Sequence, residues 1–264
     1  MMAALRAYPT LLRVGLMDMV AYRAEFLIWA LTTNMPLVML AVWHTVTADA
    51  PVGRWGQPQF VAYYLLTMVV RLITSNWVMW EITMEIRQGT LGMRLLRPIH
   101  PVLHYSAEQL AAVPMRLVFV TPVLVVLVFV AGGQLSVDPA IILMGLLAVV
   151  GAWLLQFFLM VVLGMCTFYV ESAFGLFEVW MAVHAILGGY LVPLELYPPW
   201  LRAVTDVLPF RAMLAFPVEV FMGLHDRAAV LSQLGLQWGY VVLFAVLGHL
   251  MWKAGLRRFA AFGG

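Results

Sequence analysis

The sequence predicts an all-α integral membrane protein with six transmembrane helices. Of its 264 residues, 64% are hydrophobic and only 11% are charged, whereas ordinary soluble domains carry about 25% charged residues. The mean hydropathy is +0.95. The apolar residues gather in six runs, each long enough to cross the hydrocarbon core, which takes about 20 helical residues. Such a chain lacks the polar surface that water requires, so lipid is expected to surround most of it.

The first 23 residues are expected to form an amphipathic, interfacial helix. Leu5, Tyr8 and Leu12 recur at helical spacing, while Arg6 and Arg13 fall on other faces. Two interpretations stay open: an anchor at the membrane surface, or a connecting helix that also touches a cytoplasmic partner. No cleavable signal peptide is expected, because no uninterrupted apolar run precedes these arginines.

Residues 24–264 are expected to form one transmembrane domain. Its six predicted spans are Phe26–Val46, Phe60–Trp80, Leu110–Ala131, Ala140–Thr167, Phe174–Val192 and Ala229–Trp252. A basic segment, residues 86–105, lies between the second and third spans. Residues 193–226, before the last span, are rich in Leu, Phe and Trp but contain five prolines, which break helices. This pattern predicts short helices that dip partway into the membrane, either as a gate or as a cap.

The basic residues orient the chain. Ten of the 15 lie in the N-terminal segment, in the loop after the second span with Arg116 just beyond it, and in the tail. Four lie on the opposite side, and Arg71 lies inside the second span. Because basic residues favour the cytoplasmic side, both termini are expected in the cytoplasm, with the protein in a bacterial inner membrane.

The sequence offers little catalytic or metal chemistry. The only lysine, Lys253, is not followed by Ser or Thr, so the P-loop signature is missing and the chain is not expected to hydrolyse ATP or to be an enzyme. A single cysteine, Cys166, excludes an intrachain disulfide and a cysteine-based zinc site. His100 and His104 lie four residues apart without a third ligand nearby, so no metal or cofactor is expected. The net charge of +2 is too small to indicate nucleic-acid binding.

Polar residues inside the predicted spans are the best candidates for a functional site, because they are costly in hydrocarbon. The candidates are Arg71 and Asn76 in the second span and Glu178, Trp180 and His184 in the fifth. Arg71 should face the bundle interior, a water-filled cavity or a subunit interface, with Glu178 or Asn76 as its partner. Either a purely structural pair or a substrate path fits. Small residues in the fifth span favour it as the contact with a second membrane subunit.

Three segments carry a resemblance to a known family. They are YRAEFLIWAL at 22–31, EIRQGTLGMRLLRPIHP at 85–101 and LPFRAMLAFPVEVFMG at 208–223. In this order on a six-span chain, they resemble the ABC-2 type exporter permeases, specifically the six-span ABC-2 family transporter proteins. The resemblance covers nearly the whole chain. It implies a type V exporter-like membrane subunit that pairs with a second permease, identical or related, and with cytoplasmic ATPase subunits that bind ATP and Mg²⁺.

The resemblance also assigns expected roles to two segments. A short cytoplasmic coupling helix maps onto Arg87–Tyr105, and the residues expected to couple to the ATPase are Arg87, Leu91, Arg94, Leu95, Arg97, Pro98 and His100. A broken helical hairpin before the last span matches Pro193–Phe210. There the expected extracytoplasmic gate or cap consists of Pro193, Tyr197, Trp200, Pro209 and Phe210. The substrate path would lie between the two permeases, lined by the second and fifth spans.

Taken together, these expectations predict a permease. It would move an apolar or amphipathic substrate, such as a drug, a lipid or a lipid-linked glycan, out of the cytoplasm or inner leaflet. Its partners would be the ATPase, the second permease and membrane lipids. Two alternatives stay open. A self-sufficient secondary transporter or channel predicts transport without an ATPase and a richer set of buried charges. An intramembrane lipid-modifying enzyme predicts polar residues clustered at one membrane face.

Overall fold

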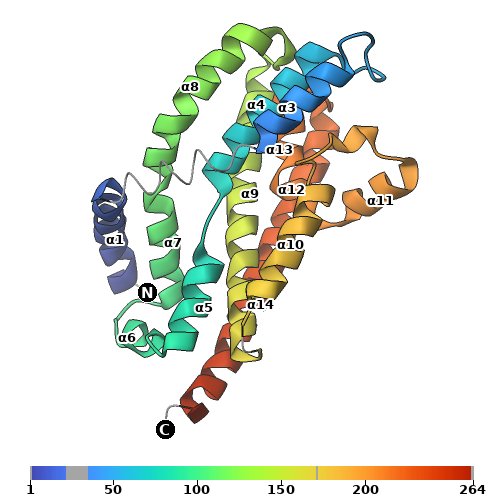
Figure 1. Cartoon of the computed structure of the whole chain (residues 1–264). Helices are drawn as coiled ribbons and strands as arrows, with labels where there is room; N and C mark the ends of the chain where they lie inside the picture. Colours follow the sequence, from blue (N-terminus) through green and yellow to red (C-terminus); the bar gives the residue numbers. More distant parts are fainter. Residues whose placement is uncertain (1, 22–34, 171, 263–264) are drawn as a thin grey trace.

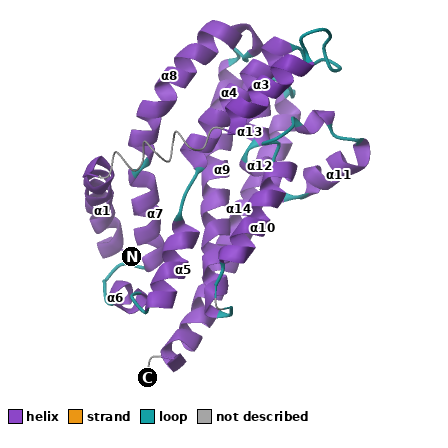
Figure 2. Ribbon diagram, viewed as in Figure 1, coloured by secondary structure: helices purple, strands orange, loops and turns teal. Residues whose placement is uncertain are grey.

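The computed structural model describes residues 2–21, 35–170 and 172–262. Over these ranges the chain is almost entirely helical, and most helices run along one long axis (Figure 2). The short helix α6 and both ends of the chain lie at one end of the bundle, called here the α6 end (Figure 1). The junction of α8 and α9, formed by the 3-10 turn η1 (Gly132–Gln134), marks the opposite end, called here the η1 end.

The bounds of the helices follow the chain from the interfacial segment to the tail. They are α1 (Met2–Ala21), α3 (Met35–Val46), α4 (Gln57–Thr74), α5 (Val78–Gln88), α6 (Leu91–Leu95), α7 (Pro101–Ala111), α8 (Val113–Ala131), α9 (Pro139–Met165), α10 (Phe174–Leu187), α11 (Pro199–Val207), α12 (Pro209–Met213), α13 (Ala215–Phe221) and α14 (Arg227–Phe262), with 3-10 turns η2 (Cys166–Phe168) and η3 (Leu194–Leu196). Helix α1 falls in the segment expected to be interfacial and packs along α7, where the Tyr8 and Ser106 hydroxyl oxygens are 3.0 Å apart.

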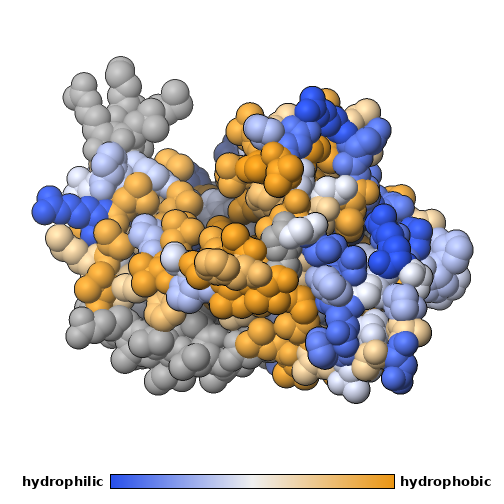
Figure 3. All heavy atoms as spheres, turned by 90° about the horizontal axis from the view of Figure 1, so that it is seen from above, coloured by the Kyte–Doolittle hydropathy of each residue, from blue (hydrophilic) through white to orange (hydrophobic). Residues whose placement is uncertain are grey.

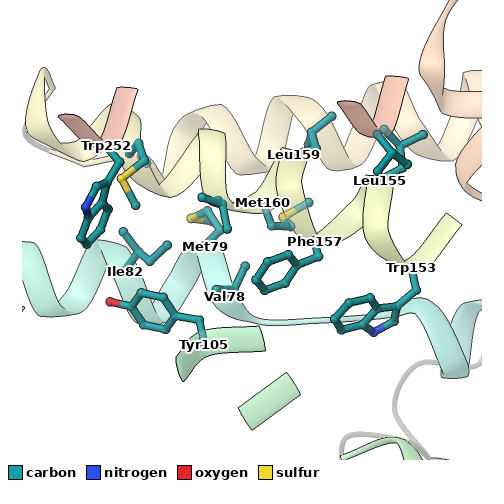
Figure 4. Close-up of a cluster of buried hydrophobic side chains, with 14 of the residues drawn as sticks. Val78, Met79, Ile82, Tyr105, Trp153, Leu155, Phe157, Leu159, Met160 and Trp252 are labelled. Atoms are coloured by element: carbon teal, nitrogen blue, oxygen red, sulfur yellow. The ribbon is translucent and has the colours of Figure 1, made fainter. Parts of the chain in front are cut away.

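Helix α9 is the centre of the bundle. None of its 27 residues is charged, and α5, α13 and α14 pack against it. A cluster of buried side chains fills the space around α5 and α9 (Figure 4), including Val78, Met79, Ile82, Tyr105, Trp153, Leu155, Phe157, Leu159, Met160 and Trp252. In lipid, helices associate through close van der Waals packing and interhelical hydrogen bonds. Gln237 of α14 supplies the latter, because its amide nitrogen donates to the carbonyls of Ala148 (2.9 Å) and Ala212 (2.7 Å).

The outer surface of the bundle is apolar where lipid would cover it. Large hydrophobic side chains stand exposed along α8, α10 and α14, with Phe129 85% exposed and Val179 64% exposed. Seen from the η1 end, hydrophilic residues gather on one side of the molecule, while hydrophobic residues dominate the rest of the coloured surface (Figure 3). An apolar exterior of this extent is the signature of a protein dissolved in a bilayer.

Within the described residues, four helical stretches are long and apolar enough to cross a membrane. They are Gln57–Gln88, Pro101–Val130, Pro139–Phe168 and Arg227–Phe259. The prediction of an all-helical membrane protein agrees with these stretches, but six spans are not confirmed. Part of the predicted span Phe26–Val46 lies outside the described residues, and the remainder is the 12-residue α3. The predicted span Phe174–Val192 contains the 14-residue α10.

Helix α10 ends at Leu187, before the predicted Val192, because the chain turns sharply at two glycines. Gly189 has φ +81°, a left-handed conformation that glycine adopts without a steric penalty. The Tyr63 hydroxyl donates to its carbonyl at 2.7 Å, and the Ala215 amide donates to the carbonyl of Gly188 at 3.1 Å. These bonds fix the turn against α4 and α13.

A Gly189→Ala substitution is expected to lower the free energy of unfolding by about 1–3 kcal/mol. The new Cβ would stand 2.6 Å from the Tyr63 hydroxyl oxygen and 2.8 Å from the Cβ of Ala215, in addition to the strained φ. Thermal unfolding in detergent measures the effect. Gly175→Ala is the matched control, because a Cβ at this position in α10 has nothing within 4 Å. Equal unfolding temperatures for the two variants would contradict the expectation.

The second predicted span, Phe60–Trp80, is interrupted, because α4 ends at Thr74 and α5 begins at Val78. A helix break leaves carbonyl groups without their usual partners. Arg116, near the start of α8, fills this need: its guanidinium donates to the carbonyls of Ser75 and Ile73, the latter at 3.5 Å, and the residue is 2% exposed. Arg116, counted above with the cytoplasmic arginines, is thus buried inside the bundle. Without it the count is nine basic residues against four, and the orientation stays a prediction.

Candidate functional site

The predicted coupling segment, residues 86–105, lies at the α6 end and joins α5 to α7 through α6. Gly89, with φ +72°, ends α5 in a left-handed turn. Pro101 is the first residue of α7, where a proline fits because its missing N–H would have no helical partner. The His100 side chain caps α7 by accepting the Val102 amide at 3.3 Å. Pro101 thus starts a helix rather than preventing one.

Arg94 ties α6 to both neighbouring helices. Its guanidinium donates to Glu85 of α5 at 2.5 Å and to Glu108 of α7 at 3.0 Å, and it lies 4.2 Å from the centre of the Tyr105 ring. The Tyr105 hydroxyl also donates to Glu85, at 2.5 Å. Burial lowers the pKa of Arg94, but the charge and hydrogen bond of Glu108 outweigh burial and raise it above the ordinary value. Arg94 therefore stays charged and acts as a clamp inside the protein.

The seven residues expected to couple to an ATPase divide into two groups. Leu91 is completely buried, and the Arg94 side chain is 14% exposed, so neither presents its side chain to a partner. Arg87, Leu95, Arg97, Pro98 and His100 are exposed. The sequence reasoning missed the two most exposed apolar residues of the segment, Met93 at 70% and Leu96 at 82%. The sequence could have indicated them, because Met93 and Leu96, the C-cap residue of α6, are apolar residues within a basic segment.

A second feature is a cavity of about 210 Å³ among α4, α9, α10 and α12, called here the inner cavity. It is lined by Arg71, Thr74, Ser75, Asn76, Trp77, Gln156, Met160, Phe177, Trp180, Met181, His184, Ala185, Tyr190, Met213 and Leu214. Arg71 and Gln156 lie near the middle of their long apolar stretches. The break between α4 and α5 supplies two of the polar lining residues, Ser75 and Asn76. The cavity therefore lies in the part of the bundle that lipid would surround.

Several buried polar atoms at the inner cavity lack hydrogen-bond partners among the described residues. They are both amide atoms of Asn76, Nε1 of Trp180 and Nδ1 of His184. The Arg71 guanidinium lies 4.9 Å from the centre of the Tyr190 ring. Because buried polar atoms normally find partners, this concentration of free ones marks the cavity as a place where water or a ligand completes the structure.

Four of the five predicted polar site residues line this one cavity: Arg71, Asn76, Trp180 and His184. Glu178 does not, because its side chain is exposed on another face of α10. The sequence reasoning missed Gln156 of α9 and Tyr190 in the turn after α10. Gln156 could have been noticed as a lone polar residue in an apolar run, whereas nothing in the sequence indicates that Tyr190 folds back toward Arg71.

A larger cavity of about 360 Å³, the outer cavity, lies between the loop after α3 and the short helices before α14. Three arginines and three carboxylates line it, and several are paired. The Arg54 guanidinium lies 2.5 Å from the Glu195 carboxylate, and both side chains are largely exposed. Arg227, close by, pairs with Asp138, the N-cap of α9, at 2.6 Å. Within the described lining residues of the outer cavity, positive and negative charges thus balance.

The buried part of the outer cavity is an ionic network centred on Arg211. Its guanidinium donates to Glu219 at 2.8 Å and to Asp206, and the His225 ring nitrogen lies 2.9 Å from Glu219. Burial by itself would raise the pKa of Glu219, but the His225 hydrogen bond and the Arg211 charge hold that pKa below its ordinary value. Glu219 therefore stays ionised, and the network joins α11, α12 and α13 to the turn before α14.

The five residues expected to form a gate or cap are spread across this region. Pro193 is buried and lines the outer cavity, and Pro209 begins α12. The Tyr197 hydroxyl donates to the Ile186 carbonyl at 2.6 Å, which ties η3 to α10. Trp200 is 69% exposed, and Phe210 approaches His184 of the inner cavity with ring centres 6.3 Å apart. The predicted set therefore does not form one cluster; Phe210 borders the inner cavity and Pro193 the outer one.

Comparison with known proteins identifies the chain at the level of a family. Residues 24–263 match the family model described as ABC-2 family transporter protein. No curated protein matches the sequence. Among the described residues, no group of three or more His, Cys, Asp or Glu is placed to hold a metal ion. The match covers Arg94 and its partners, both cavities and the four long apolar stretches. The chain therefore belongs to the ABC-2 family of transporter proteins, as a multi-pass membrane component of an ABC transporter.

Proposed function

We propose that this chain is the permease subunit of an ATP-driven exporter and moves an apolar or amphipathic substrate out of the cytoplasm or the inner leaflet. A separate ATPase subunit binds ATP and Mg²⁺, and a second permease, identical or related, completes the membrane part. Both termini lie in the cytoplasm of a bacterium. The observation that supports the proposal best is the coupling segment, which presents apolar side chains at the α6 end while its base is clamped by Arg94.

The mechanism follows from the connections of α6. A pull or push on the exposed side chains of Met93 and Leu96 passes through the Arg94 clamp to Glu85 of α5 and Glu108 of α7. Helix α5 leads directly to the broken segment at Ser75–Trp77, which forms one wall of the inner cavity. ATP binding by the partner would therefore change the shape of the inner cavity without any covalent chemistry on this chain.

A Met93→Asp/Leu96→Asp double variant is expected to lose most of its binding to the ATPase, because two carboxylates would replace the apolar centre of the contact. The measurement is the amount of an ABC ATPase from the same genome that co-purifies with the chain in mild detergent, together with ATP turnover. We expect a reduction of at least about tenfold in both. The fold should remain intact, because both side chains are more than two thirds exposed.

Val137→Asp is the matched control, since Val137 is 87% exposed but lies at the η1 end, between η1 and α9. It should leave ATPase recovery unchanged. Undiminished recovery with the Met93→Asp/Leu96→Asp variant would remove the coupling role of this segment. Transport by the purified chain without any ATPase would instead favour a secondary transporter.

A further inference from the structure

We propose that the inner cavity binds the anionic head of an amphipathic molecule, a carboxylate or phosphate group carried on an apolar body. The inference rests on the proposed function, because it names the class of molecule that the permease would move. Its basis is the juxtaposition of Arg71, Asn76 and Trp180 around one cavity at membrane depth.

The lining of the inner cavity is rich in hydrogen-bond donors. An arginine guanidinium and an indole N–H only donate, and the amide of Asn76 contributes two further N–H groups. The Trp180 Nε1 and both Asn76 amide atoms have no partner among the described residues. Neither Asp nor Glu occurs in the described lining, so arginine is its single formally charged residue type. A ligand group that accepts several hydrogen bonds fits these donors, and a negative charge on it is attracted by the arginine, as for carboxylates and phosphates.

The size of the cavity limits what it can hold. Apolar cavities of about 150 Å³ accommodate one benzene molecule, so about 210 Å³ holds a head group and a few carbon atoms. The remainder of an amphipathic molecule must extend outward. Two lining residues, Trp77 and Met181, are 43% and 50% exposed, so the lining reaches the outer surface of the bundle and gives the cavity a mouth there. An apolar body leaving through this mouth would enter lipid.

An aromatic wall lies beside the donors. The rings of Phe177, Trp180 and His184 stack along one side of α10, with successive centres 5.7 and 4.9 Å apart. Residues at this spacing share one helix face. The wall provides flat apolar contact for the carbons next to the head group, while the Trp180 N–H remains available to the head itself.

The test is equilibrium binding of radiolabelled probes to the purified chain in dodecyl maltoside, a neutral detergent. Dodecanoate and dodecyl phosphate present the two anionic heads; dodecanol and dodecyltrimethylammonium present a neutral and a cationic head on the same tail. At least one anion is expected to bind about tenfold more tightly than the neutral and cationic probes. Whichever anion binds more tightly identifies the head group as a carboxylate or a phosphate. Equal binding of all four probes would overturn the proposal.

Variants locate the bound head. Trp180→Phe removes one donor but keeps an aromatic ring, and it should weaken anion binding about tenfold. Trp153→Phe is the matched control, because the Trp153 Nε1 is also buried and without a partner in the described structure, yet Trp153 does not line the cavity. Arg71→Gln should reduce the preference for anions further. If Trp153→Phe weakens binding as much as Trp180→Phe, the proposed location is wrong.

These measurements need neither ATP nor an ATPase, so their outcome is independent of the proposed transport function. One outcome is that the chain binds anions selectively, that Trp180→Phe loses this binding, and that no ATPase co-purifies. This outcome would support the site and refute the exporter. ATPase coupling with no preference for anionic probes would support the exporter and refute the site.

Discussion

An Arg94→Ala variant is expected to lose nearly all ATP-driven turnover while keeping the exposed contact surface of α6. The Arg94 side chain is 14% exposed and that of Glu85 is 19% exposed. Removing one partner of such a buried ion pair costs about 3–5 kcal/mol. Because Arg94 joins α6 to α5 and α7 together, the loss falls on the junction that would transmit force to the membrane helices. Movement of an attached ATPase would then displace α6 alone.

Two measurements separate this effect from a general loss of folding. Amide hydrogen exchange over residues 85–108 should accelerate by at least about tenfold in Arg94→Ala, whereas exchange in α9 should not change. ATP turnover of the complex should fall while the ATPase still co-purifies. Arg87→Ala serves as the control for hydrogen exchange, since Arg87 belongs to the same segment but is exposed. Unaltered exchange at the junction in Arg94→Ala would show that the clamp contributes no rigidity.

An Arg211→Ala variant is expected to lose about as much stability as Arg94→Ala, and more than the other single substitutions proposed for this protein. The side chains of Arg211 and Glu219 are 13% and 8% exposed, so the change leaves a buried carboxylate with only His225 as partner and costs about 3–5 kcal/mol. The exposed pair of Arg54 and Glu195 provides the comparison, and Arg54→Ala should cost no more than about 1 kcal/mol. Titration with a denaturing detergent measures both. Similar losses in the two variants would contradict the assignment of Arg211 as the centre of the network.

The same network gives a pH dependence with a definite sign. The folded-state pKa of Glu219 lies below its ordinary value, so Glu219 contributes stability at pH values above that ordinary value. This contribution disappears as the pH falls through the lowered, folded-state pKa. The difference in stability between the wild type and Arg211→Ala should therefore be constant near neutral pH and shrink only in acid. A difference that shrank as the pH rose toward neutral would refute this assignment.

The sequence predicted the long apolar helices well because their composition leaves no alternative. Helix α9 was expected at Ala140–Thr167 and runs from Pro139 to Met165, continued by η2. Its uncharged length is visible in the sequence. The structure adds an N-cap, in which the Asp138 carboxylate accepts the Ala140 amide at 3.0 Å. The last helix was expected to end at Trp252 but continues to Phe262. Hydropathy indicates which residues lipid can surround. A helix can continue beyond the lipid into water, so hydropathy does not predict where the helix ends.

The roles of individual arginines could not be predicted. Arg87, Arg94 and Arg97 look equivalent in a basic loop, yet Arg94 points inward because Glu85 and Glu108 come from two helices that only the fold brings together. Arg116 looked like a cytoplasmic charge. The inner cavity combines residues from Arg71 to Leu214, so its existence depends on helix packing rather than on any local pattern. The sequence does indicate which residues belong to such a site, because polar residues are rare in the membrane-spanning part of a chain.

The bond between Arg116 and the broken helix also bears on how the protein enters the membrane. Arg116 stands in the middle of Pro101–Val130, where an arginine in an isolated helix opposes insertion by about 2.5–3.5 kcal/mol. The carbonyls of Ser75 and Ile73 that accept its guanidinium belong to a helix that is synthesised earlier. Transfer from the translocon into lipid is therefore most favourable when Gln57–Gln88 is still adjacent. The interruption in the first of these stretches would then serve the second one, because it supplies the carbonyls that accept its arginine as both enter lipid.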